Sequence, residues 1–253
     1  MHDALLIYRL HTMIPLESIS SENGVLFPAR DLELFPAQLD HTECIMIGLH
    51  GRNANKFAFF PFVRQMGFLH TQWILPSAPF ADPQAPETRW WFERETHRIE
   101  QIQASKDRIA RLIDAVVMFG VPAESVFLVG FSQGAVMALE TALKYPTRLG
   151  GVVALSGYLA APERLAIERH KANARLPVFL SHGTQDETLP VDFGRQTEAA
   201  LLSHGYSVEY HEYPNGHRIS SSGVRDIRAF LHRHMYGLPI DDPRLNDQHI
   251  VAF

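Results

Sequence analysis

Short apolar runs recur along the middle of the chain, and segments long enough to form helices separate them. The runs lie at 44–50 (CIMIGLH), 73–75, 126–130 (VFLVG), 152–155 (VVAL) and 178–180 (VFL). A short run that is apolar throughout is typical of a strand buried on both faces of a parallel sheet. The segment at 207–213 alternates apolar and polar positions. It therefore predicts a strand nearer the edge of the sheet.

The intervening segments predict helices over 107–119, 133–143, 193–202 and 224–234. In the first of these, apolar residues follow helical spacing, and Gly120 and Pro122 come after it as stop signals. Strands that alternate with helices imply right-handed crossovers. The expected fold class is therefore α/β, with a mostly parallel central sheet and helices on both faces.

The chain contains no internal repeat and no linker long enough to separate two domains. We expect one domain over residues 1–253, with a core at roughly 42–236, an N-terminal extension (1–41) and a C-terminal tail (237–253). The extension and the tail lie outside the alternating pattern, so edge strands, packing arms and a homodimer contact are all open for them. The proline-rich stretch 76–86 predicts an ordered surface loop or cap, because proline disfavours helix interiors and central strands.

The amino-acid composition excludes several classes of protein. Of the 253 residues, 46% are apolar and 20% charged, which is ordinary for a folded domain. The net charge of −5 and the scattered basic residues argue against nucleic acid as a partner. We expect no stable membrane insertion, because no apolar stretch approaches the roughly 20 residues of a membrane span.

The N-terminal residues, the cysteine count and the histidine spacing bear on the cellular compartment and on metal binding. The first residues lack the basic region and cleavage site of a secretory signal. The single cysteine, Cys44, cannot form an internal disulfide, which favours a cytoplasmic protein. Fourteen histidines invite a metal interpretation. However, there is no H-E-x-x-H or C-x-x-C pattern, so we expect no metal site.

The pentapeptide Gly130-Phe131-Ser132-Gln133-Gly134 carries the strongest chemical signal. It is a G-x-S-x-G that directly follows an expected strand and directly precedes an expected apolar helix. In that context the serine is held in a sharp turn with its hydroxyl exposed, and the helix N-terminus favours developing negative charge. A plain turn with a capping serine is the alternative, and we favour Ser132 as a nucleophile.

A nucleophilic serine needs a base and an orienting acid, which in this fold come later in the chain. Asp186 lies in a polar loop after the strand at 178–180, and the neighbouring Glu187 is an alternative acid. Of the six histidines after Asp186, only His217 lies in a loop between the last expected strand and the last expected helix. We therefore predict a Ser132, Asp186 and His217 triad.

The tetrahedral intermediate of acyl transfer also needs an oxyanion hole. One donor is the backbone N–H of the residue after the nucleophile, Gln133, and the other comes from a loop after an early strand. The loop Leu49-His50-Gly51-Arg52-Asn53 follows the first apolar run. The backbone N–H of Arg52 is the expected second donor.

Five motifs in order now identify a family resemblance: LHGRN, the Trp91-Phe92 pair, GFSQGA, HGTQDETLP and the late NGH. Together they resemble the phospholipase/carboxylesterase family of α/β-hydrolases, which includes the acyl-protein thioesterases. The resemblance implies an α/β-hydrolase fold, hydrolysis of small-molecule esters or thioesters, no cofactor, and the triad above. The chain departs from the family pattern at Arg52, Asn53 and Glu93. At the second of these, asparagine tolerates the positive φ that the family's glycine would adopt.

Aromatic residues near these motifs are candidates for substrate binding. Trp90, Trp91 and Phe92 stand beside the proline-rich loop and are expected to form an apolar wall. The aromatic run at 57–68 could line an acyl pocket, but we favour a place in the core. The expected function is a serine esterase or thioesterase acting on short to medium acyl groups through an acyl-enzyme. The alternatives are a lactone- or peptide-cleaving hydrolase of the same fold and a catalytically silent binding protein.

Overall fold

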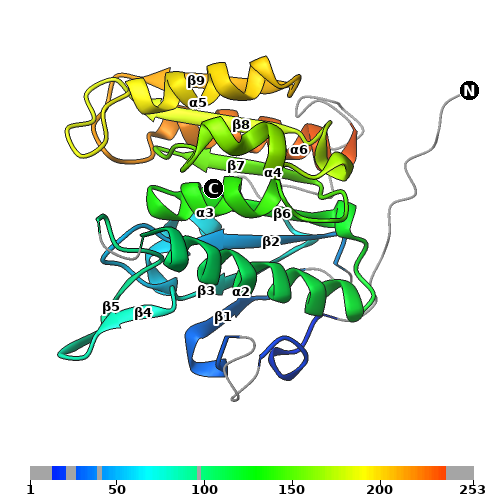
Figure 1. Cartoon of the computed structure of the whole chain (residues 1–253). Coiled ribbons are helices and arrows are strands. Elements are labelled where there is room, and N and C mark those ends of the chain that lie inside the picture. The colour runs from blue at the N-terminus through cyan, green and yellow to red at the C-terminus, as the bar shows by residue number, and fades with distance from the viewer. Residues whose placement is uncertain (1–12, 21–26, 39–41, 96–97, 238–253) are drawn as a thin grey trace, which may run out of the picture.

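The computed structural model describes residues 13–20, 27–38, 42–95 and 98–237 (Figure 1). Its centre is a seven-stranded sheet in the order β1-β3-β2-β6-β7-β8-β9. The strands are β1 (Leu32–Phe35), β2 (Cys44–Leu49), β3 (Thr71–Pro76), β6 (Val126–Phe131), β7 (Gly151–Leu155), β8 (Val178–Gly183) and β9 (Val208–Tyr213). Among the described strands of this sheet, only β1 pairs antiparallel, with β3. The predicted mostly parallel sheet is therefore confirmed.

Helices cover both faces of the sheet, as the alternating pattern predicts. The α-helices are α1 (Phe60–Met66), α2 (Arg98–Met118), α3 (Gln133–Ala142), α4 (Leu165–Glu168), α5 (Asp192–Ser203) and α6 (Ser221–Tyr236). Short 3₁₀ helices lie at Leu16–Ser18, Ala29–Asp31, Lys56–Phe59, Ala123–Ser125, Pro162–Arg164 and Lys171–Asn173. One buried cluster joins α2, α3 and α5 to one face of the sheet, and a second joins α1 and α6 to the other.

Two segments differ from the sequence predictions. The helix expected from 107 begins at Arg98. Its first turns consist mostly of good helix formers, which allows the helix to extend. They carry few apolar residues, so the hydrophobic periodicity did not reveal them. The proline-rich stretch, expected as a loop, contributes to a two-stranded ribbon of β4 (Phe80–Asp82) and β5 (Ala85–Trp90). Pro86 is not among the paired positions of this ribbon, so its missing N–H costs no hydrogen bond between the two strands.

The described part of the N-terminal extension forms an edge strand and a packing arm. β1 closes the sheet next to β3. Ahead of it, the Ile14 backbone forms two hydrogen bonds with the side chain of Gln72, at 3.0 and 2.9 Å. Ile14, Ile19 and Phe27 are almost fully buried in the main core. Residues 1–12 and the tail from 238 lie outside the described residues.

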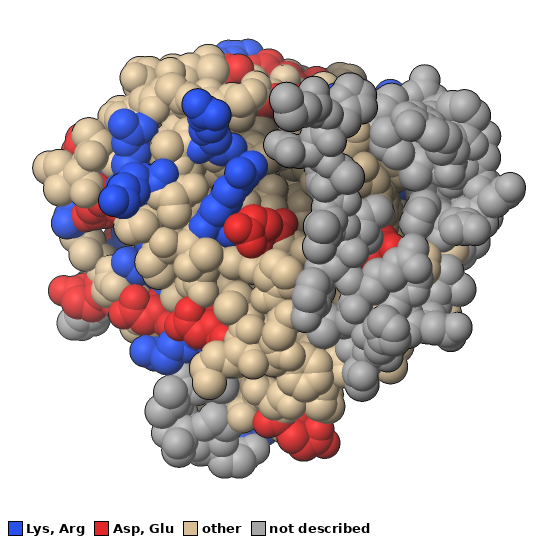
Figure 2. Space-filling model, turned by 90° about the vertical axis from the view of Figure 1, so that its right-hand side faces the viewer, with Lys and Arg blue, Asp and Glu red and all other residues tan. Residues whose placement is uncertain are grey.

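The parallel strands direct their following loops to one edge of the sheet, at the left of Figure 1, where the ribbon β4–β5 also lies. That edge carries the ends of β2, β6 and β8, and with them the motif residues. The face at the right of Figure 1 carries both basic and acidic side chains, with lysine and arginine gathered on one part of it (Figure 2). Within the described ranges, no helix is both long and apolar enough to cross a membrane.

Candidate active site

Ser132 lies in the sharp turn between β6 and α3, at the centre of the sheet. Its backbone has φ of 56° and ψ of −120°, a conformation that residues with a Cβ rarely adopt. The turn is held from both sides, since Ser132 N–H donates to Leu155 O at 2.8 Å and Ala135 N–H donates to Ser132 O at 2.9 Å. The predicted strand-turn-helix context of the motif is therefore present.

The two glycines of the motif are required by close backbone contacts. A Cβ on Gly130 would lie 2.1 Å from Gly134 O, and a Cβ on Gly134 would lie 2.0 Å from Leu49 O. Neither backbone atom can move aside as a flexible side chain could. The second contact presses the first turn of α3 against the end of β2, which brings the N-terminus of α3 beside the loop that begins at His50.

Asp186 and His217 meet at the ends of β8 and β9. His217 Nδ1 lies 2.6 Å from Asp186 Oδ2, a short distance typical of a charge-assisted hydrogen bond. Because the carboxylate accepts, Nδ1 carries the proton and the opposite nitrogen, Nε2, is the acceptor in the neutral ring. Glu187, the alternative acid, is exposed. The structure thus brings the predicted acid and histidine together.

The carboxylate of Asp186 is fixed by its own loop. Its Oδ1 accepts hydrogen bonds from the backbone N–H groups of Thr188 and Leu189, both at 2.9 Å. Its Oδ2 also lies 3.5 Å from Nε2 of His182, a histidine that is 1% exposed. His182 donates from Nε2 to Leu189 O at 2.8 Å, and burial lowers its pKa. Asp186 is therefore held in one orientation, with its free lone pairs toward His217.

The ring of His217 packs against Phe131, the residue before Ser132, with 4.8 Å between the ring centroids. This contact places the histidine next to the serine turn. The side chain of His217 is 18% exposed, whereas that of Asp186 is fully buried. The histidine thus stands between the buried acid and the solvent-facing turn.

The loop after β2 lies against the serine turn. A Cβ on Gly51 would lie 3.4 Å from Ser132 Cβ. Asn53 has φ of 59°, as its replacement of a glycine predicts, and its N–H donates to Arg89 O at 2.8 Å. Arg52 lies between them, and its side chain donates to Phe92 O at 3.3 Å and to Glu93 Oε2 at 3.1 Å.

His50 locks this loop to the segment after β3. Its Nδ1 donates to Gly51 O at 2.7 Å, and its Nε2 accepts from Ala78 N–H at 2.9 Å. Burial lowers its pKa to about 4, so the ring is neutral and can keep one donor and one acceptor. The His50 carbonyl accepts from Trp91 Nε1 at 2.8 Å. His50 is thus a structural anchor of the loop.

The predicted substrate-binding aromatics take different places. Trp91 is fully buried in the core, which corrects the expectation that its ring lines a cleft. Its indole N–H is better satisfied inside, by the carbonyl of His50. Trp90 is half-buried, with the guanidinium of Arg52 5.6 Å from its ring centroid. Phe92 is 2% exposed and lines a cavity together with Ser132.

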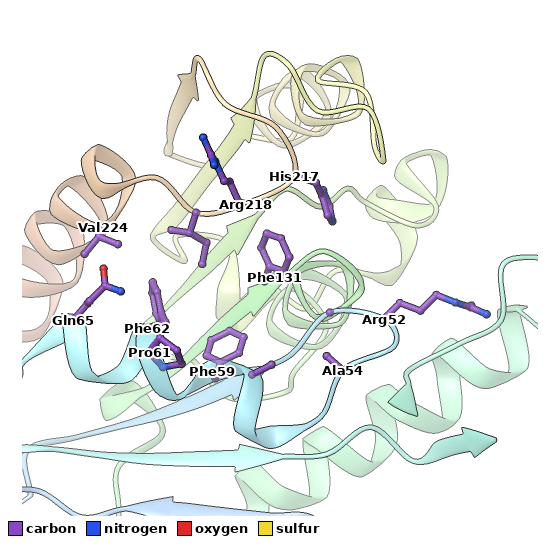
Figure 3. A pocket seen from close by; sticks show the side chains of 13 residues that line it. Arg52, Ala54, Phe59, Pro61, Phe62, Gln65, Phe131, His217, Arg218 and Val224 are labelled. Atoms are coloured by element: carbon purple, nitrogen blue, oxygen red, sulfur yellow. The ribbon is translucent and has the colours of Figure 1, made fainter. Parts of the chain in front are cut away.

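Two cavities open on either side of Arg52. The first, of about 380 Å³, is mostly apolar and is lined by Phe59, Pro61, Phe62, Phe131 and His217 among others (Figure 3). The second, of about 350 Å³, is lined by Ser132 and Gln133 on one wall. Figure 3 shows the Arg52 side chain directed away from the apolar side chains of the first cavity.

The aromatic run at 57–68 belongs mainly to the core, as favoured from the sequence. Phe59, Phe62, Met66 and Phe68 are buried in the cluster under α1 and α6. Phe59 and Phe62 also line the first cavity, because they lie at the margin of that cluster. Phe57 is 53% exposed and belongs to neither.

Sequence reasoning missed the side chain of Gln133. Its Oε1 accepts from Trp91 N–H at 3.1 Å, and its Nε2 donates to Phe92 O at 2.7 Å. The residue that follows the serine thus holds the segment after β5. No local sequence pattern predicts these hydrogen bonds, since they join positions about forty residues apart.

The sheet, the serine turn at the end of β6 and the acid-histidine pair after β8 and β9 define an α/β-hydrolase. The chain belongs to the phospholipase/carboxylesterase family, whose model matches residues 34–235. It is an esterase or thioesterase, as its relatives indicate.

Among curated relatives, acyl-protein thioesterase 1 of Eremothecium gossypii is 33% identical over 66% of this chain and 76% of its own. Carboxylesterase SOBER1 of Arabidopsis thaliana is 28% identical over 66% of this chain and 79% of its own. Among solved structures, esterase PE8 has a TM-score of 0.73 at 27% identity and covers 79% of this chain and 97% of its own.

Proposed function

We propose that Ser132, His217 and Asp186 form the catalytic triad of this esterase or thioesterase. The observation that carries the proposal is the 2.6 Å contact of His217 Nδ1 with Asp186 Oδ2, next to a serine held at φ of 56°. The acid fixes the tautomer of His217, so its Nε2 can take a proton from the Ser132 hydroxyl. All three residues come from loops at the same edge of a parallel sheet, where catalytic groups of open α/β folds gather.

The reaction proceeds in two halves. In the first, Ser132 Oγ attacks the carbonyl carbon of the ester or thioester while His217 Nε2 accepts the hydroxyl proton. The tetrahedral intermediate then expels the alcohol or thiol, which takes that proton from His217. In the second half, water replaces the serine by the same route, and the acid and free Ser132 are released. No cofactor enters either step.

The backbone N–H groups of Gln133 and Arg52 stabilise the oxyanion in this proposal. Gln133 is the first residue of α3, so its N–H has no acceptor within the helix. Arg52 follows Gly51, whose position against Ser132 brings the loop next to the nucleophile. Such preorganised donors contribute about 3–4 kcal/mol to lowering the barrier.

The two cavities supply the substrate site, with Trp90 and Phe92 near Arg52 and Trp91 supporting them from the core. Cavities of about 380 and 350 Å³ suit a short to medium acyl group and its leaving group. We also assign the enzyme to the cytoplasm, because its one cysteine, Cys44, cannot form an internal disulfide.

Labelling with a fluorophosphonate probe tests the nucleophile. The wild type should gain one probe mass on Ser132, and Ser132→Ala should lose both the label and the activity, with kcat falling on the order of 10⁴-fold or more. Ser203→Ala, at the exposed end of α5, is the matched control and should keep both. Probe on another serine of a folded Ser132→Ala enzyme would contradict the proposal.

A further inference from the structure

The cavity beside Ser132 is lined by three arginines. Arg52, Arg94 and Arg98 share it with Phe92, Tyr158 and Phe193, among others. None of the described residues that line it is acidic. A concave site with several guanidinium groups and no carboxylate in its wall attracts anions.

The three arginines differ in how far their charge is already satisfied. Arg52 pairs with Glu93, which leaves it the least available. Arg98, the first residue of α2, donates from Nη2 to Tyr158 OH at 3.2 Å. Its guanidinium lies 5.7 Å from the Tyr158 ring and 6.0 Å from the Phe92 ring. Within the described residues it has no ion-pair partner.

Arg98 is therefore held in place without an ion pair to any described residue, although it also lines a separate cavity that contains Glu140, Glu163 and Glu168. The rings of Phe92 and Tyr158 and the Tyr158 hydroxyl orient the guanidinium, which reduces the entropy that a ligand would otherwise have to offset. A guanidinium has five N–H donors, and a carboxylate can accept two of them in parallel. Arg94 is exposed at the same cavity and adds a second positive charge.

The position of His217 shows which part of the substrate would meet these arginines. His217 lines the apolar cavity and not the arginine cavity. The histidine protonates the leaving group, so the alcohol or thiol lies on the apolar side. The acyl chain, bonded to Ser132 in the intermediate, then extends into the arginine cavity, whose wall includes Ser132.

We propose that the enzyme prefers esters or thioesters whose short acyl chain ends in a carboxylate, with Arg98 as the main residue that binds this anion. The leaving group is apolar. This assignment rests on the proposed function, because it needs Ser132 and His217 to act on the scissile bond.

Matched benzyl esters test the assignment with release of benzyl alcohol as the readout. Benzyl hydrogen glutarate carries the terminal carboxylate, and benzyl glutaramate replaces it by a neutral amide of nearly the same shape. We expect kcat/KM to be about tenfold to hundredfold higher for the acid, as for hydrogen bonds to a charged group. The advantage should shrink as salt is raised, since exposed charges are screened.

Arginine variants test whether Arg98 causes the preference for the acid over the amide. Arg98→Gln should reduce the acid-to-amide ratio toward one, and Arg98→Lys should retain part of it, because the charge remains without the planar fork. Arg175→Gln is the control, since this exposed arginine precedes β8 at the opposite edge of the sheet. It should leave the ratio unchanged. Thermal unfolding of each variant checks that it is folded.

The outcomes separate this assignment from the proposed function. Equal or better hydrolysis of the amide by the wild type would overturn the assignment while leaving an active esterase. A preference for 4-carboxybenzyl hexanoate over benzyl hexanoate would overturn it as well, because the anion would then lie on the leaving group. Inactivity toward every ester, including p-nitrophenyl acetate, would overturn the proposed function itself.

Discussion

The side-chain amide of Gln133 donates a hydrogen bond to the carbonyl of Phe92 at 2.7 Å. Through its oxygen the same amide accepts from Trp91 N–H. The first residue of α3 is thus tied to the segment between β5 and α2, which also contacts Arg52 through Phe92 O. One glutamine side chain thereby connects both proposed oxyanion donors.

Gln133→Ala should impair both catalysis and stability. The substitution leaves the buried N–H of Trp91 without its partner, at about 1–3 kcal/mol, and leaves Phe92 O with only the 3.3 Å hydrogen bond from Arg52. We expect kcat to fall about tenfold to hundredfold with a smaller change in KM, because the backbone N–H is kept but its position is not. Steady-state kinetics and urea unfolding measure the two effects. Gln103→Ala, on the exposed face of α2, should match the wild type. An unchanged kcat in Gln133→Ala would show that the side chain does not position the donor.

Gly134→Ala should destabilise the protein strongly. The added methyl would lie 2.0 Å from Leu49 O and 2.7 Å from His50 O, so α3 must shift away from β2. Overpacking of this kind costs about 1–3 kcal/mol or more, and the shift also disturbs the oxyanion loop. Thermal unfolding and activity on p-nitrophenyl acetate measure the result. Gly205→Asn is the control, because no atom lies within 4 Å of a Cβ there and asparagine tolerates its φ of 82°. Wild-type stability in Gly134→Ala would be inconsistent with this packing.

The stability of the protein should fall as pH is lowered from about 6.5 toward 4. Burial lowers the pKa of His50 to about 4, whereas an unfolded histidine titrates near 6.5. Between these values the unfolded chain binds a proton that the folded protein does not, so the free energy of unfolding rises with pH in this window. His50 contributes at most about 3 kcal/mol to this change.

Chemical denaturation at a series of pH values measures the effect of His50. His50→Gln should flatten the fall between pH 6.5 and 4, although its stability at neutral pH will also be lower. His182, whose pKa burial also lowers, acts in the same direction and keeps part of the slope. His204→Gln, at the end of α5, is the control and should retain the wild-type slope. Parallel curves for wild type and His50→Gln would show that His50 is not the group responsible.

His217→Gln and Ser132→Ala should not add to one another. Each should lower kcat on the order of 10⁴-fold, and the double variant should be no slower than either, because the two side chains act as one unit. The measurement is kcat on p-nitrophenyl acetate with purified, folded variants. Multiplying losses would indicate that His217 and Ser132 act independently.

Acyl chain length should have a limited effect. Between β7 and β8 the described chain has one short α-helix, α4, next to two 3₁₀ helices. Leu165 of α4 is buried in the core, and its Glu168 pairs with Lys144 after the C-terminal end of α3. This segment forms no lid over Ser132. Each methylene adds at most about 0.8 kcal/mol until the chain reaches solvent. We expect kcat/KM for p-nitrophenyl esters to level off at medium length, with no interfacial activation. A steep rise through palmitate would contradict this.

Local patterns were sufficient for the parallel strands β2, β3, β6, β7, β8 and β9 and for the serine turn. Buried parallel strands are apolar throughout, and a G-x-S-x-G between such a strand and a helix has few structural solutions, as Gly130 and Gly134 illustrate. The left-handed conformation of Asn53 was expected from the glycine that the family has at this position. The strand and turn signals reside in neighbouring residues.

Other features depend on contacts between distant segments, which a single sequence does not encode in any local pattern. The burial of Trp91 depends on the hydrogen bond from its indole N–H to the carbonyl of His50. The edge strand β1 forms only because β3 lies beside it. The three arginines come together from the loop after β2, from the segment that joins β5 to α2, and from the first residue of α2. Packing of distant segments determines which side chains meet across a cavity. The sequence alone therefore predicted a hydrolase, and only the tertiary structure decided which charges face its substrate.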